Sequence, residues 1–150
     1  MRAIVVSREV PGTPEALFTT IASPSTWEHW MASHRDFVDD TPDRLTEGST
    51  LVAEILMHGM IEEIEWTVTR LDDPNRIVLY GNVRTGWQCD LTYWLIQSEN
   101  GTTVTASVVL TGPAITGTIA TLVEGQGRQQ LGRTLGQLGA LAGSAGRLGA

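Results

Sequence analysis

Hydrophobic and polar residues alternate along several stretches of the chain, and this alternation predicts β-strands. It is clearest over residues 87–95, where one face carries Trp87, Cys89, Leu91, Tyr93 and Leu95. The opposite face is mostly polar. Residues 60–70 and 103–111 alternate in the same way. Each of these segments is therefore expected to turn one face to a core and the other to water.

Turn signals divide the chain into about seven strands. The expected strands are residues 2–10, 37–40, 49–58, 60–71, 76–83, 87–97 and 102–110. Turns such as Asp72-Asp73-Pro74-Asn75 and Asn100-Gly101 separate them. Because short connections join consecutive strands, the last six are predicted to form an antiparallel meander. Residues 51–58 and 77–83 carry apolar and polar residues on both faces, so the pattern leaves open which of their side chains point inward.

Two short helices are expected after the first strand. Thr13-Pro14-Glu15 supplies an N-cap residue, a proline at the first helical position and an acid in the first turn, which indicates a helix over 16–22. Ser23-Pro24 starts a second helix over 25–30. The proline between them predicts two helices at an angle rather than one rod.

A long helix is predicted after Gly112-Pro113. It carries one apolar stripe of Ile115, Ile119 and Leu122 and another of Leu131, Leu135, Leu138 and Ala142. At about 100° per residue the two stripes do not line up, so a bend or loosened turn is expected between them, at Gly125 and Gly127. Residues 1–142 are expected to form a single domain, followed by a Gly/Ala-rich C-terminal tail over 143–150.

Composition narrows the class of protein. A chain of 150 residues with 41% hydrophobic residues is expected to bury a core of its own. Its net charge is −7 and its ten basic residues are not clustered, which argues against nucleic-acid binding. The apolar runs are too short to insert into a membrane, and the first residues do not match a secretory signal. With a single cysteine, Cys89, these features predict a cytoplasmic protein.

Several motifs, taken in order, match a known superfamily. They are Val10-Pro11-Gly12-Thr13-Pro14-Glu15-Ala16-Leu17-Phe18, Ile21-Ala22-Ser23-Pro24-Ser25-Thr26-Trp27-Glu28-His29-Trp30, Gly48, residues 66–74 and the hairpin of residues 101–104. With the leucines of the terminal helix, nearly the whole chain resembles the START/SRPBCC superfamily and, within it, the polyketide cyclase/dehydrase and lipid transport group. The resemblance implies an α+β helix-grip fold, in which a curved antiparallel sheet wraps around a long C-terminal helix. A strongly bent sheet is not filled by one helix, so an apolar cavity is expected between them.

The residues expected to contact a ligand are mostly large and apolar. Trp66, Trp87 and Tyr93 lie on the apolar face, and aromatic rings with polar tips suit a planar ligand. Ordinary core packing is the alternative for each. Trp30 and Met31 are expected to act as a lid. The full set is Trp30, Met31, Ile55, Met57, Trp66, Trp87, Cys89, Tyr93, Ile119 and Val123.

Candidates for acid–base chemistry are few. His58 is one because imidazole titrates near neutral pH, and Glu54 or Asp90 would serve if either pointed into the cavity. Alternation places Asp90 on the polar face and leaves Glu54 undecided. The spacing of His29, His34 and His58 does not match a zinc site, so no metal is expected. No phosphate loop or dinucleotide motif is present, so no cofactor is expected either.

The sequence supports three hypotheses about function. The first is a binding protein for a small hydrophobic or aromatic molecule, lipid-like or polyketide-like, with almost wholly apolar cavity walls. The second is a polyketide-cyclase-like enzyme, which needs Glu54, His58 or Asp90 inside the cavity. The third is an interaction module that forms a homodimer through an uncovered stripe of the terminal helix. On that hypothesis Leu135→Asp would dissociate the dimer without unfolding the body.

Overall fold

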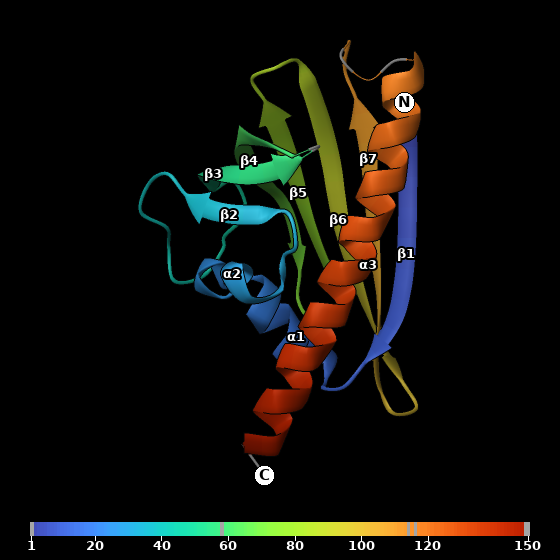
Figure 1. The fold of residues 1–150 in the computed structure, drawn as a ribbon. Helices are drawn as coiled ribbons and strands as arrows, with labels where there is room; N and C mark the ends of the chain where they lie inside the picture. The colour runs from blue at the N-terminus through green and yellow to red at the C-terminus, as the bar shows by residue number, and fades with distance from the viewer. Residues whose placement is uncertain (1, 58, 114, 116, 149–150) are drawn as a thin grey trace.

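The computed structural model describes residues 2–57, 59–113, 115 and 117–148, and shows a curled sheet packed against one long helix (Figure 1). Within these residues the sheet has seven strands: β1 (Arg2–Val10), β2 (His34–Phe37), β3 (Thr50–Met57), β4 (Met60–Asp72), β5 (Arg76–Val83), β6 (Trp87–Ser98) and β7 (Gly101–Thr111). Their order is β1-β7-β6-β5-β4-β3-β2, and neighbouring strands are antiparallel. The predicted α+β class and the meander are confirmed.

The predicted strand over residues 37–40 is wrong in position. β2 instead covers His34–Phe37 and pairs with β3, with Phe37 opposite Ala53. The strand begins this early because His34 and Phe37 pack against the ring of Trp27, at centroid distances of 5.9 and 5.4 Å. Tertiary packing on the preceding helix therefore decides where this short edge strand lies.

The structure settles the two strands whose faces the pattern left open. In β3 the side chains of Leu51, Ala53, Ile55 and Met57 are buried, and Glu54 is exposed on the outer face. In β5 the buried positions are Ile77, Leu79, Gly81 and Val83. β4, β6 and β7 bury the faces that their alternation predicts. All seven strands thus contribute to one apolar concave face or its edge.

Two short helices and a 3-10 turn close one end of the sheet. They are α1 (Pro14–Ile21), η1 (Pro24–Thr26) and α2 (Trp27–Trp30). The hydroxyl of Thr13 accepts a hydrogen bond from the amide of Ala16 at 3.2 Å, which confirms the expected N-cap. The indole of Trp27 donates to the carbonyl oxygen of Ile21 at 2.9 Å and joins α2 to α1.

The terminal helix α3 (Gly117–Leu148) differs from its predicted pattern. It runs without interruption through Gly125 and Gly127 and continues into the segment predicted as a tail. Leu122, which the pattern placed in one of two apolar stripes, does not lie on the buried face of α3, because 58% of this residue is exposed. The buried face instead runs Ala120, Val123, Leu131, Thr134, Leu135 and Leu138. Together with Gly127, which lies between Val123 and Leu131, these positions form a single stripe along a regular helix. The bend or loosened turn expected at Gly125 and Gly127 is therefore not needed. No described helix is long and apolar enough to cross a membrane.

Glycine on α3 allows the helix to approach β1 closely. A β-carbon added at Gly127 would lie 2.7 Å from Ile4 Cδ1, and one added at Gly139 would lie 3.2 Å from Val10 Cγ1. Gly125, in contrast, faces open space. The inward glycines of α3 are therefore packing positions, whereas Gly125 has no contact that requires a glycine.

Alanine at Gly125 is predicted to stabilise the protein. Glycine costs about 0.5–1 kcal/mol relative to alanine inside a helix, so Gly125→Ala should raise the free energy of unfolding by about that amount. Gly127→Ala gains the same helix propensity but forces Ile4 to move, and we expect most of the gain to disappear. Urea denaturation of both variants measures the difference. Equal stabilisation by the two substitutions would contradict the close packing of α3 on β1.

Candidate functional site

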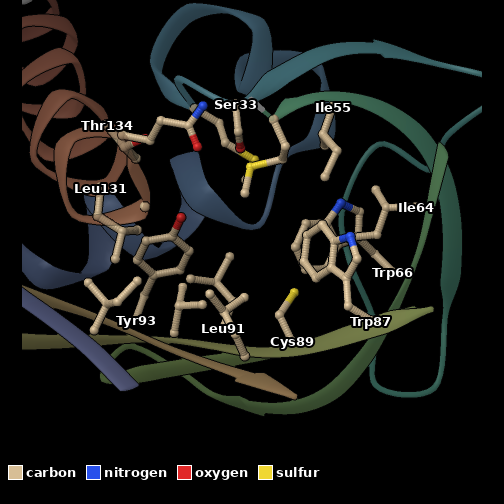
Figure 2. Close-up of a pocket in the computed structure, with 17 residues that line it drawn as sticks. Ser33, Ile55, Ile64, Trp66, Trp87, Cys89, Leu91, Tyr93, Leu131 and Thr134 are labelled. Atoms are coloured by element: carbon tan, nitrogen blue, oxygen red, sulfur yellow. The ribbon is translucent and has the colours of Figure 1, made fainter. Parts of the chain in front are cut away.

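A pocket lies between the concave face of the sheet and α3 (Figure 2). Its volume is about 70 Å³. The sheet supplies most of its wall, α3 supplies one side and the segment after α2 supplies two residues. The lining residues are Ile4, Met31, Ser33, Ile55, Met57, Ile64, Trp66, Trp87, Cys89, Leu91, Tyr93, Val108, Leu110, Gly127, Gln130, Leu131 and Thr134.

Aromatic rings face each other across this pocket. Figure 2 shows the indoles of Trp66 and Trp87 on one side and the ring of Tyr93 on the other. Trp66 comes from β4, and Trp87 and Tyr93 come from β6, so the pleat of two strands directs all three rings inward. Three aromatic rings therefore form opposite sides of a mostly apolar wall.

Gly81 makes room for one of these rings. It lies on β5 directly between Trp66 and Cys89 in the strand register. A β-carbon at this position would lie 2.8 Å from Cζ3 of Trp66, 2.9 Å from Sγ of Cys89 and 2.6 Å from Cδ1 of Ile64. The missing side chain therefore lets the Trp66 indole rest on the sheet. Sequence reasoning missed Gly81, although a lone glycine in a buried strand is a known signal of close approach.

The polar atoms of the pocket are not equally satisfied. The Nε1 of Trp87 donates to a carboxylate oxygen of Glu62 at 3.3 Å. The Nε1 of Trp66 is buried and has no hydrogen-bond partner among the described residues. The pocket wall therefore contains hydrogen-bonding capacity that the protein does not use.

Two titratable side chains line the pocket, and burial keeps both protonated at neutral pH. Burial raises the pKa of the Cys89 thiol to about 12 and also raises the pKa of the Tyr93 hydroxyl. Neither group is a base or a thiolate nucleophile in this environment. Both remain neutral groups that can donate a hydrogen bond.

The structure brings together most of the residues predicted to contact a ligand. Those that line the pocket are Met31, Ile55, Met57, Trp66, Trp87, Cys89 and Tyr93. Trp30 is fully buried behind the pocket, where it packs edge-on against Tyr93 at 5.9 Å and donates to the hydroxyl of Thr26. Val123 is buried on α3 but is not part of the wall. The side chain of Ile119 lies outside the described residues.

The predicted acid–base candidates do not meet in the pocket. Glu54 is exposed on the outer face of β3, opposite Glu63, and Asp90 is exposed on the outer face of β6, opposite Tyr80. His58 lies outside the described residues. None of the described lining residues is a carboxylate, an imidazole or a guanidinium. The described side chains also include no cluster of three potential metal ligands.

Two polar side chains of α3 join the helix to the far side of the pocket. Gln130 donates to the carbonyl oxygen of Leu56 on β3 at 2.9 Å. The hydroxyl of Thr134 accepts a hydrogen bond from the amide of Ala32, also at 2.9 Å. Sequence reasoning missed both residues because a polar residue inside an apolar stripe has no distinctive pattern. These contacts hold α3 over the pocket.

A second, more polar depression lies on the surface next to α2. Its lining residues are Pro24, Ser25, Glu28, His34, Arg35, Asp36 and Phe37. The Nδ1 of His34 is buried there without a hydrogen-bond partner. Burial lowers the pKa of His34, against the opposing effects of Asp36 and Glu28. The lining residues of this depression are all different from those of the pocket between the sheet and α3.

The sequence model of a family described as "Polyketide cyclase / dehydrase and lipid transport" matches residues 1–140. Among curated proteins, the chain is 25% identical over 117 residues to "Uncharacterized protein Rv1546" of Mycobacterium tuberculosis, covering 78% of this chain and 82% of that protein. It is 27% identical over 117 residues to "Toxin Rv0910" of the same species, covering 78% and 81%.

Solved structures with the same fold include protein CV1439 from Chromobacterium violaceum. The TM-score is 0.74 at 17% sequence identity, and the match covers 95% of this chain and 98% of that one. At this level of identity the likeness concerns the fold alone.

Removing the Thr134 hydroxyl is predicted to destabilise the protein. Thr134→Val preserves the shape of the side chain but leaves the amide of Ala32 without its partner, which should cost about 1 kcal/mol of unfolding free energy. Thr121→Val makes the same change at an exposed position of α3 and serves as the control. Urea denaturation compares the two. Equal effects would show that the Thr134–Ala32 hydrogen bond does not hold the helix.

Stability is predicted to fall as His34 becomes protonated. Folding lowers the pKa of His34 below its value of about 6.5 in the unfolded chain. The folded state is therefore most stable above pH 6.5, where His34 is neutral in both states. That contribution is lost as pH falls below 6.5 toward the lower folded value. Unfolding free energies at pH 7.5 and 5.5 should therefore differ less in His34→Gln than in the wild type. The control variant His29→Gln retains His34 and should show the same difference in unfolding free energy between the two pH values as the wild type. If His29→Gln reduces this difference and His34→Gln does not, the prediction is contradicted.

Proposed function

Because the chain belongs to the polyketide cyclase/dehydrase and lipid transport family, we propose that it binds one small hydrophobic or aromatic molecule in the pocket between the sheet and α3. One observation carries the proposal: an apolar pocket lined by three aromatic rings, one of which, Trp66, has a buried Nε1 without a partner among the described residues. Pockets of this composition, mostly apolar with a few polar atoms, are the usual sites for small ligands.

The size of the pocket limits the ligand. Typical sites for drug-sized molecules enclose roughly 300–1,000 Å³. The volume of this pocket is about 70 Å³. The natural ligand is therefore compact, or the side chains of Met31 and Met57 move aside to admit it, since methionine has unusual conformational freedom.

Binding fits the site better than proton transfer does. A cyclase-like enzyme needs a group that exchanges a proton near neutral pH. Cys89 and Tyr93 remain protonated because burial raises their pKa values. Glu54 and Asp90 face away from the pocket. The described side chains thus support a carrier or sensor rather than an acid–base catalyst.

The α3 stripe that contains Leu135 and Leu138 is not the uncovered stripe that the homodimer hypothesis needs. Leu135 and Leu138 are fully buried against the sheet side of the same molecule. The expectation that Leu135→Asp would separate a dimer and spare the fold is therefore wrong, because the substitution would place a carboxylate in the core.

Filling the pocket is predicted to weaken binding. Toluene added to ¹⁵N-labelled protein should shift the amide signals of residues that line the pocket. Ile55→Phe occupies the space with a larger side chain and should weaken toluene binding at least about tenfold. Ile96→Phe makes the same change at an exposed position on the outer face and should bind as the wild type does. Binding that is equal in both variants, or absent in the wild type, would overturn the proposal.

A further inference from the structure

The strongest unexplained feature of the molecule is the indole nitrogen of Trp66. Only 4% of this residue is exposed, and its buried Nε1 has no hydrogen-bond partner in the part of the chain that the structure describes. An indole N–H can donate a hydrogen bond but cannot accept one. Buried donors almost always have a partner, because burial removes the water that would otherwise accept the bond. The missing partner is therefore an acceptor that the described part of the protein does not provide.

The other indole of the pocket, that of Trp87, does have a hydrogen-bond partner. Trp87 also lines the pocket, and its Nε1 donates to Glu62. A phenylalanine at position 66 would keep an aromatic wall without a buried donor. Trp66 thus places a donor in an apolar wall at an energetic cost, and a ligand acceptor would remove that cost.

The other polar groups of the pocket indicate the charge of the ligand. The lining includes hydroxyls, a thiol and an amide, but no described cationic side chain that could pair with an anion and no carboxylate that could pair with a cation. Burying an unpaired charge is far more costly than burying a neutral dipole. A fatty-acid carboxylate or an amine is therefore a poor match for the described wall.

We infer that the ligand is a neutral molecule with a compact aromatic or flat apolar body and one carbonyl-type acceptor, such as a ketone, ester or quinone oxygen, that receives a hydrogen bond from Trp66. This inference rests on the proposed function and adds the chemical class of the ligand. Gly81 positions the donor, because its missing side chain allows the Trp66 indole to lie where it does.

The test compares three probes of nearly the same shape: acetophenone, its hydrocarbon analogue α-methylstyrene, and benzoate. Dissociation constants are measured by NMR titration for the wild type, Trp66→Phe and Trp87→Phe. Both variants lose one indole N–H and keep an aromatic ring, but only Trp66 has an N–H without a partner. Comparing the ketone with the hydrocarbon within each protein cancels the change in pocket shape.

The expected result is a change in selectivity at one position. The ratio of the acetophenone to the α-methylstyrene dissociation constant should rise roughly fivefold to tenfold in Trp66→Phe and stay within about twofold in Trp87→Phe. Benzoate should show no saturable binding. A ratio that is unchanged in Trp66→Phe, an equal change in both variants, or benzoate binding tighter than acetophenone would overturn the inference while leaving the pocket as a binding site. If no neutral probe binds any of the three proteins, the proposed function fails as well.

A second measurement on the wild type covers the case in which Trp66→Phe does not fold. The indole N–H signal of Trp66 should move downfield on addition of acetophenone and should not do so with α-methylstyrene. The same response to both probes would show that the carbonyl oxygen does not meet this N–H.

Discussion

The packing of α3 against β1 is the contact on which the pocket depends. Gly127 and Gly139 let the helix approach Ile4 and Val10. α3 makes most of its sheet contacts with β1 and few with β7, so it covers one edge of the concave face (Figure 1). Because one helix cannot also reach the inner side chains of β4 to β6, space remains in front of them. Gln130 and Thr134 then hold the helix to the opposite side of that space.

The sheet could be predicted from the sequence where one face of a strand is apolar. β6 is the clearest case, since Trp87, Cys89 and Tyr93 alternate with more polar residues and face inward as expected. β3 and β5 could not be resolved, because their side chains are mixed on both faces and their orientation depends on the partner strands. Gly81 is an example: its inward place becomes meaningful only when Trp66 lies across it.

The helix and the site were less predictable for a different reason. The pattern assigned Leu122 to a separate apolar stripe because only hydrophobic residues marked the stripes, whereas the buried stripe passes through Gly127, which has no side chain to reveal it. Trp30 was expected to form a lid over the ligand, but its ring is buried and packs edge-on against Tyr93. The sequence does not predict which indole N–H has a hydrogen-bond partner. Trp87 donates to Glu62 and Trp66 has no acceptor among the described residues, and this difference depends on the three-dimensional position of Glu62.

The central claim is that the space between α3 and the sheet is a site for one small neutral molecule. Native mass spectrometry of the protein purified from its own cells, and again after equilibration with the neutral apolar fraction of those cells, tests this claim most directly. We expect an ion heavier than the bare chain by the mass of one compact molecule. Denaturation should release this molecule, and solvent extraction should recover it as an uncharged compound. The bare chain alone in both preparations, or a released compound that is a carboxylic acid, would contradict it.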